Sequence, residues 1–322
     1  MQGAAAPTPR STEKKAAPAP WQAGSGRRWV IALPYAWLLL FFLLPFLIVV
    51  KISVSEMETV TLKDLLTYQD DVLQLTVRFN NYRFLLQDDL YFKTYLASLR
   101  YAAIATACCL LLGYPFAYFM ARARSSLQPV LVMGVMLPFW TSFLLRVYAW
   151  KGLLSEHGWV AEMAVALGLD QLLWWAGAIP APGKLMHTPF SLVLGMVYTY
   201  LPFMVLPLYA TLSKLDPRLL EAAQDLGATR WVAFWTVTVP LSKAGIVAGA
   251  MLVFIPCVGE FVIPELLGGP QTLMIGRVLW DEFFSNNDWP MASSVAVVVV
   301  LLITVPLALF HKYEAEAQEA RR

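Results

Sequence analysis

The chain has 322 residues, of which 58% are hydrophobic and 14% are charged, and its formal net charge is +2 at pH 7. An ordinary soluble domain carries about 25% charged residues, so this composition, with a mean hydropathy of +0.58, excludes a soluble globular protein. The apolar residues gather in long runs, which is typical of an integral membrane protein. The small net charge is uninformative by itself, and we predict no nucleic-acid partner.

The first part of the chain predicts a basic tail followed by one membrane helix. Residues 1–28 are rich in Ala and Pro and contain five Lys and Arg residues, which predicts a disordered cytoplasmic tail. The apolar run 29–52 is too long for the core of a signal peptide and lacks a small-residue cleavage site, so we expect a retained transmembrane helix. An acidic stretch follows, so 29–95 is predicted to combine the first span with a periplasmic segment.

Six apolar runs approach the ~20 residues that a bilayer span requires. They are 29–52, 96–121, 128–150, 189–212, 243–266 and 290–311. The basic tail before the first run predicts a cytoplasmic N-terminus, and an even number of spans returns the tail 312–322 to the cytoplasm. The predicted fold class is therefore all-α, a polytopic membrane protein whose core, 96–311, holds five of the six spans.

Prolines interrupt most of these runs and predict kinks. They are Pro115, Pro138, Pro202, Pro207, Pro256, Pro264 and Pro306. A proline removes a backbone hydrogen bond, and membrane helices tolerate this where neighbouring helices or a water-lined cavity satisfy the freed carbonyl. The pattern favours a bundle around a path over a set of passive anchors.

A polar connector, 213–242, between two apolar runs predicts a short helix-turn-helix on the cytoplasmic side. Asp216 is suited to cap the first helix, and Gly227 is suited to the left-handed position that closes it. Thr229 is suited to cap a second helix, which Pro240 is expected to end. A protruding helix pair of this kind predicts a docking element.

The chain offers little material for catalysis or for a cofactor. Its three cysteines lie inside apolar runs, its three histidines are scattered, and neither set has metal-ligand spacing. The segment from Gly177 to Lys184 differs from a phosphate-binding loop in spacing and has no Ser or Thr after the lysine. We therefore predict no metal, no bound cofactor, no ATP site and no enzymatic activity in this chain.

Ionisable and aromatic residues inside the apolar runs are the candidates for a transport path, because a charge at membrane depth is costly. Glu260 has two interpretations: it lines the path, or it forms a structural ion pair with Arg146. Trp140 and Tyr198 either line the path or lie at the membrane interface. Asp281 belongs to an acidic, aromatic segment that fits a polycationic ligand and equally fits a solvated loop.

One motif in the connector carries a family resemblance. It reads Glu221-Ala222-Ala223-x-x-x-Gly227, then nine residues, then Val237-Thr238-Val239-Pro240. This pattern resembles the "EAA" loop of binding-protein-dependent ABC importer permeases, although the family pattern usually ends Ile-x-Leu-Pro. The resemblance implies the type I ABC importer permease fold and a loop that enters a groove on a separate cytoplasmic ATPase. On this reading Asp216, Glu221, Ala222, Ala223, Gly227 and Pro240 form the coupling loop.

Three further segments, 140–150, 260–270 and 280–290, resemble polyamine importers of the bacterial inner membrane. This resemblance implies a polyamine substrate, putrescine first, and a second homologous permease. It also implies two copies of an ATPase that binds ATP and Mg²⁺, and a periplasmic polyamine-binding protein. The alternatives are a permease for another small solute, an ion-coupled secondary transporter and a non-transporting membrane scaffold.

Overall fold

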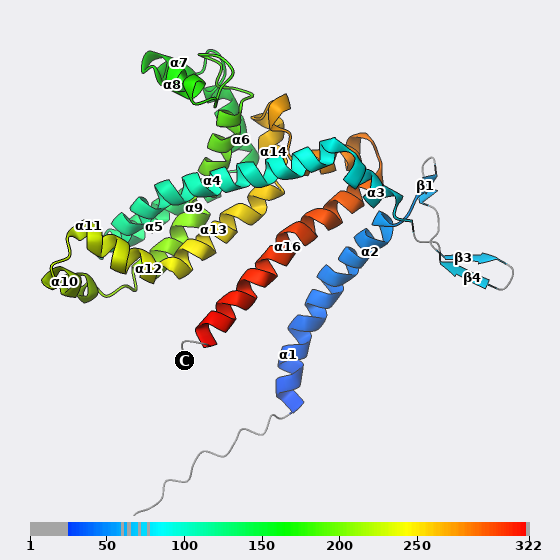
Figure 1. The fold of residues 1–322 in the computed structure, drawn as a ribbon, viewed down its shortest axis with the longest axis horizontal. Coiled ribbons are helices and arrows are strands. Elements are labelled where there is room, and N and C mark those ends of the chain that lie inside the picture. Colours follow the sequence, from blue (N-terminus) through cyan, green and yellow to red (C-terminus); the bar gives the residue numbers. More distant parts are fainter. Residues whose placement is uncertain (1–24, 59–60, 63–65, 70–71, 76–77, 320–322) are drawn as a thin grey trace, which may run out of the picture. The chain divides into compact units, whose positions relative to one another are not determined.

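The computed structural model describes residues 25–319 except 59–60, 63–65, 70–71 and 76–77 (Figure 1). The predicted tail 1–28 therefore lies outside the described residues apart from its last four, which already belong to a helix. Contacts divide the chain into two units, Met1–Ile48 and Val49–Arg322. Each unit is described by itself.

The first unit is an apolar helix. It consists of α1 (Ser25–Leu38), the π-helical η1 (Leu39–Leu43) and the beginning of α2 (Leu44–Ser53). The segment Val30–Ser53 is long and apolar enough to span a bilayer, and none of its most apolar window is buried within the protein. The predicted span 29–52 is thus present as a helix whose side chains require a lipid or protein environment.

The segment after α2 contains strands that the expectation of a purely helical chain did not include. Two antiparallel hairpins, each of very short strands, precede one helix; their members are β1 (Met57–Glu58), β2 (Thr61–Leu62), β3 (Leu66–Gln69), β4 (Val72–Leu75) and α3 (Asn80–Gln87). The Ser53 and Tyr82 hydroxyls lie 2.7 Å apart, and Ser294 donates to the Ser53 carbonyl at 3.0 Å. These bonds tie the end of α2 to α3 and to the last helix.

Three helices form the centre of the second unit: α4 (Asp89–Arg122), α9 (Pro189–Leu212) and α13 (Lys243–Val258). They pack against one another (Figure 1). Along α13 the buried residues recur every four positions, at Gly245, Gly249, Val253 and Cys257. Small side chains at this spacing let helix backbones approach closely, which is a common packing mode inside membranes.

Two predicted spans are not single straight helices, in agreement with the kinks that their prolines predict. The span 128–150 consists of α5 (Gln128–Met136), the 3-10 turn η2 (Leu137–Trp140) and α6 (Phe143–Leu153), with a bend of 88° at the break. Pro138 lies in this 3-10 turn, where its missing N–H contributes to the interruption. The span 243–266 is divided by residues 259–261 into α13 and α14 (Val262–Leu266).

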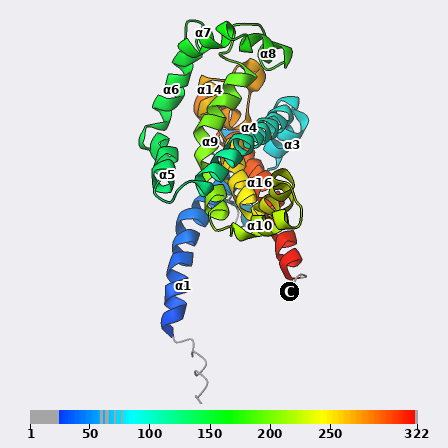
Figure 2. The same ribbon diagram turned by 90° about the vertical axis from the view of Figure 1, so that its left-hand side faces the viewer.

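The remaining elements lie around this centre. They are α7 (Trp159–Ala166), α8 (Leu169–Trp175), α10 (Arg218–Asp225), α11 (Arg230–Ala233), η3 (Phe234–Thr238), α12 (Val239–Leu241), η4 (Pro270–Thr272), α15 (Ile275–Trp280), η5 (Asp281–Ser285) and α16 (Trp289–Glu319). Beyond the N-terminal end of α9 lie α7 and α8, and beyond its C-terminal end lies α10 (Figure 2).

The described residues contain three helices that are long and apolar enough to cross a membrane, or five if each bent pair counts as one span. The sixth predicted span, 290–311, falls on α16, in which the fully described segment Trp289–Thr304 is apolar and by itself shorter than a span. Six spans therefore remain a prediction. The predicted tail 312–322 begins inside α16, which continues as a helix to Glu319.

Candidate functional site

The first candidate site is the helix pair formed by α10 and α11, and its local design follows the sequence prediction. The Asp216 carboxylate accepts a hydrogen bond from the Arg218 N–H at 3.0 Å, just before α10. Thr229 accepts one from the Val232 N–H at 3.3 Å at the start of α11. Both predicted caps are confirmed, and each satisfies a backbone donor that a helix N-terminus leaves free.

Gly227 closes α10 in a backbone conformation that favours glycine. Its φ is +90°, and the Ala228 N–H donates to the Ala223 carbonyl at 3.0 Å. No atom lies within 4 Å of the position that a Cβ at Gly227 would occupy. The requirement for glycine here comes from the backbone angle and not from a lack of space.

The prediction that Pro240 ends the second helix is wrong by one residue, because the helical segment continues to Leu241. Instead α11 passes into the π-helical η3, the Val239 N–H donates to the Phe234 carbonyl, and α12 contains Pro240 before it ends at Leu241. Proline is tolerated in the first turn of a helix, where its missing N–H would have had no partner. The widened turn places Pro240 at such a position, and the chain then bends by 65° into α13.

Two leucines on and directly after α10 are exposed. Leu226 is 91% exposed and Leu219 is 46% exposed, and no residue of α10 is buried. Ala222 is exposed and Ala223 half-buried. Within the described chain Glu221 forms no ion pair with Arg218, and it lines a hollow of about 320 Å³ instead. An exposed amphipathic helix with rigid caps is a ready-made surface for insertion into a groove on another protein.

The second candidate site is the break between α13 and α14, where Glu260 is 9% exposed. One oxygen of its carboxylate accepts backbone hydrogen bonds from Val262 at 3.1 Å and Ile263 at 3.5 Å. The other accepts a hydrogen bond from the Tyr200 hydroxyl of α9. Glu260 thus caps α14 and fastens the break to the central helix, so both of its oxygens have partners.

The structure does not bring Arg146 and Glu260 into an ion pair anywhere in the part of the chain that it describes. The guanidinium of Arg146 lies 5.9 Å from the ring centroids of both Phe139 and Phe143. Its Nε and one Nη are buried without a hydrogen-bond partner. The interpretation of Glu260 as the ion-pair partner of Arg146 is therefore not observed, and the Glu260 carboxylate accepts from Tyr200 and two backbone amides instead.

An aromatic stack brings Asp281 into the region of Glu260. The rings of Phe261 and Trp280 lie 4.4 Å apart at an angle of 8°, and these residues directly adjoin Glu260 and Asp281 in the chain. A Cβ at Gly276 would lie 2.5 Å from the Gly259 carbonyl oxygen and 2.6 Å from that of Glu260. The glycine therefore lets α15 pass directly against the break.

Charges and rings are exposed around this stack. Trp280 is 41% exposed, and its ring also contacts Phe284 at 4.1 Å. Arg277 pairs with Glu265 at 2.7 Å and lies 3.9 Å from Asp281. The stack therefore lies beside carboxylates, of which Glu265 and Asp281 share the Arg277 cation.

The other two predicted path residues lie elsewhere. Trp140 is 73% exposed at the end of η2. Tyr198 contacts the Trp150 ring at 5.4 Å and lines a separate cavity of about 290 Å³ among α4, α5 and α9. It is Tyr200 that meets Glu260, because two residues along a helix turn the side chain by about 200°.

Sequence reasoning placed Tyr200 among the aromatic residues that could line a path and Trp280 in the acidic, aromatic segment, but it joined neither to Glu260, and it did not single out Phe261 or Gly276. Tyr200 lies 60 residues from Glu260, and no local pattern joins them. The adjacency of Phe261 and Glu260 was the one signal in the sequence that a ring adjoins the carboxylate. Among the described residues no cluster of three or more His, Cys, Asp or Glu has the geometry to hold a metal ion.

The family profile of binding-protein-dependent transport system inner membrane components matches residues 109–314. The spermidine/putrescine transport system permease protein PotB of Salmonella typhimurium is 38% identical over 282 residues, which cover 87% of this chain and 91% of that protein. This match includes both candidate sites.

Solved structures share the fold at lower identity. A bacterial ABC transporter involved in the import of the acidic polysaccharide alginate contains a chain with a TM-score of 0.58 and 17% identity, which covers 90% of this chain and 98% of its own. Another structure shows a bacterial alginate ABC transporter in complex with an alginate pentasaccharide-bound periplasmic protein. It contains a chain with a TM-score of 0.51 and 17% identity, and the match covers 87% of this chain and 92% of that chain. At this identity the likeness concerns the fold alone.

Proposed function

Because the chain belongs to the family of binding-protein-dependent transport system inner membrane components and is a permease subunit of an ABC importer, we propose that it forms part of the transport path for polyamines, with putrescine first among them. The alternatives of an ion-coupled secondary transporter and of a non-transporting scaffold do not agree with this family. The competing hypothesis is an ABC importer permease for another small solute. The two hypotheses differ in the charge and chemical class of the substrate that is taken up.

The observation that carries the substrate proposal is the joint position of Glu260, the Phe261–Trp280 stack and Asp281. A polyamine that enters the membrane loses hydration around each ammonium group. Carboxylates and aromatic faces replace part of that hydration. The relative that is 38% identical is named for spermidine and putrescine. The alginate transporter handles an acidic polysaccharide on the same fold, so side chains and not the fold must select the charge of the substrate.

The energy for transport is proposed to come from a separate cytoplasmic ATPase, present in two copies, that binds ATP and Mg²⁺. This chain would contribute α10 with the Leu226 that follows it. Leu219 and Leu226 are exposed, and Asp216 and Gly227 fix the two ends of the helix. Movement of the ATPases would push on the 213–242 loop and switch access to the path between the two sides of the membrane. The wider assembly would include a second homologous permease and a periplasmic polyamine-binding protein.

This mechanism requires the two termini and the 213–242 loop to be cytoplasmic and the segment after α2 to be periplasmic. Reporter fusions test the orientation directly. A fusion after Thr67 is expected to be periplasmic, and a fusion after Thr229 is expected to be cytoplasmic. If either reporter lies on the opposite side, the coupling role of the loop is refuted.

The experiment that tests the function is uptake by the complete complex reconstituted into vesicles, with ATP inside and the binding protein outside. The substrates are labelled putrescine, spermidine, neutral and acidic amino acids, and an inorganic anion. We expect ATP-dependent uptake of putrescine and spermidine only. Uptake of an amino acid or anion without uptake of polyamines would refute the substrate proposal and leave the role as an importer permease standing.

A further inference from the structure

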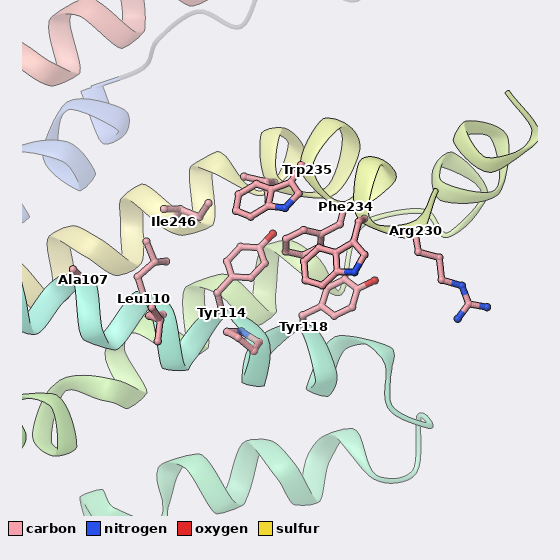
Figure 3. A pocket seen from close by; sticks show the side chains of 12 residues that line it. Ala107, Leu110, Tyr114, Tyr118, Arg230, Phe234, Trp235 and Ile246 are labelled. Carbon is pink, nitrogen blue, oxygen red and sulfur yellow. The ribbon is translucent and has the colours of Figure 1, made fainter. Parts of the chain in front are cut away.

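An apolar groove runs along α4 opposite the second helix of the coupling loop (Figure 3). Its volume is about 770 Å³, and 12 residues line it. Arg230 is the only charged residue among them, and it lies at one end of the groove. The groove shares Tyr118, Phe234 and Arg230 with the hollow beside Glu221, so the two adjoin.

The floor of the groove is preformed. The Phe234 ring contacts four other rings, at centroid distances of 5.6 Å to Tyr114, 5.8 Å to Tyr118, 6.3 Å to Trp231 and 5.3 Å to Trp235. The hydroxyls of Tyr114 and Ser242 lie 2.8 Å apart and join α4 to the bend before α13. A floor fixed by these contacts persists without a ligand, so a ligand that binds there loses little to ordering of the protein.

The walls are open to the surroundings and match one leaflet of a bilayer. Leu111 is 72% exposed and Trp235 is 61% exposed. On α4 the lining runs from Ala107 to Tyr118, which is about 16 Å of helix at ~1.5 Å per residue. The hydrocarbon core of a bilayer is about 30 Å thick, so one leaflet measures about 15 Å. The groove therefore has the length and polarity of a site for an acyl chain.

The end of the groove near the coupling loop is basic. Arg230 points outward past the aromatic floor (Figure 3), and the Arg122 guanidinium lies 5.6 Å from the centre of the Tyr118 ring. Neither arginine forms an ion pair with any residue that the structure describes, and Glu221 is the one acidic residue that lines the same end. Tryptophans such as Trp231 and Trp235 are typical of the headgroup level.

We propose that this groove binds an anionic phospholipid. One acyl chain would lie on the Phe234 floor between α4 and η3, and the phosphate would lie between Arg122 and Arg230. Basic pockets between membrane helices select anionic headgroups by charge. Two arginines against one glutamate give the site a net positive charge, whereas a neutral lipid would gain contact with the apolar walls alone. The bound lipid would connect α4 to the helix that carries the coupling loop.

The test measures lipid retained by the complete complex after exchange into vesicles of phosphatidylcholine mixed with phosphatidylglycerol. Native mass spectrometry counts the bound lipids. Loss of one arginine near a membrane surface costs about fivefold in binding of an anionic lipid, so Arg122→Gln and Arg230→Gln are each expected to reduce retained phosphatidylglycerol by about that factor. Arg124→Gln is the matched control, because Arg124 carries the same charge close by and does not line the groove.

A second variant tests the apolar part of the site. Ala107→Phe fills the far end of the groove while both arginines stay in place, and it is expected to displace the lipid. A photo-crosslinking residue at position 111 is expected to label a phospholipid.

Three outcomes would overturn the proposal: equal retention of phosphatidylglycerol and phosphatidylcholine, an effect of Arg124→Gln as large as that of the other two variants, or crosslinking of position 111 to another subunit. The last outcome would assign the groove to a protein interface. The inference rests on the proposed position of this end of the protein at a membrane surface. Its failure leaves polyamine uptake intact, so the two proposals fail separately.

Discussion

The coupling helix α10 and the break at Glu260 are built in opposite ways. The features that fix the backbone of α10 are local in sequence. Asp216 precedes the helix, Gly227 follows it, and no side chain between them is buried. The break takes its partners from distant parts of the chain, with the Tyr200 hydroxyl on Glu260 and the Trp280 ring on Phe261.

The difference indicates how each region can change. Substitutions on the exposed face of α10 leave its caps in place, so they are expected to have little effect on stability. Around Glu260 folding and transport depend on the same atoms, because the carboxylate both caps α14 and presents charge. Variants at the break therefore need controls that separate protein abundance from activity, and variants on α10 need controls that separate strain from lost contact.

The largest effect is expected from Gly276→Val. The added Cβ would lie 2.5 Å and 2.6 Å from two backbone oxygens, which cannot move unless the break moves. Overpacking costs about 1–3 kcal/mol and occasionally more, and because two backbone oxygens are met at once we expect the protein level in the membrane to fall sharply. Immunoblots of membranes and thermal unfolding of the complex measure this effect. Gly259→Ala is the control, since a Cβ there meets no atom within 4 Å; equal abundance of both variants would contradict the packing argument.

The next prediction separates the two roles of Glu260. Glu260→Gln keeps an oxygen for the Val262 and Ile263 amides and an amide group for the Tyr200 oxygen, so abundance is expected to stay normal. Uptake of putrescine is expected to fall about tenfold, equivalent to about 1.4 kcal/mol, because the negative charge is lost. Tyr200→Phe is expected to lower abundance and to leave uptake per protein nearly unchanged. It keeps the negative charge but leaves a buried carboxylate oxygen without its donor, at a cost of about 1–3 kcal/mol in stability.

Arg146 provides the check on this interpretation. Since the structure shows no ion pair between Arg146 and Glu260 in its described part, adding Arg146→Gln to Glu260→Gln is expected to restore neither uptake nor abundance. Recovery of uptake in the double variant would show that the two charges act as a pair. In that case the assignment of Glu260 to the transport path would be wrong.

A smaller effect is expected from Gly227→Val. At a φ of +90° a β-branched residue adds about 1–3 kcal/mol of backbone strain, and there is space for its side chain. We expect normal insertion but reduced copurification of the ATPase and reduced uptake. Gly152→Val is the control: its Cβ also meets no atom within 4 Å, and its φ lies outside the left-handed region. If both variants couple equally well, the turn at Gly227 does not set the coupling surface.

The smallest effect on stability is expected from Leu226→Asp, because a side chain that is 91% exposed loses almost no burial. Binding of the ATPase, measured by copurification, is nevertheless expected to weaken, since a charge would enter a proposed apolar contact. Leu86→Asp is the matched control on α3, where the leucine is 88% exposed and distant in sequence from the loop. ATPase binding that is unaffected by Leu226→Asp would exclude this face of α10 from the interface.

Local rules in the sequence were sufficient for the helix pair. The caps at Asp216 and Thr229 and the left-handed glycine at position 227 are confirmed, since a cap depends on residues within three positions of one another. Run length was sufficient to indicate the long membrane helices. Run length did not show that 128–150 and 243–266 bend or break, because hydropathy is unchanged by a turn inside an apolar segment. The prolines in these runs predicted kinks, but not that the helix is interrupted at 141–142 and at 259–261.

Tertiary structure alone decided the chemistry of the buried break. The sequence placed Glu260 at membrane depth and offered Arg146 as its partner. The folded chain gave it Tyr200 and two backbone amides instead. A buried carboxylate takes whichever donors the packing of distant helices brings within reach, and that packing is set by shape across α9, α13 and α15. Segments that lie far apart in the chain carry no local signal of the contact, so the partner of Glu260 follows from the fold and not from its neighbours in sequence.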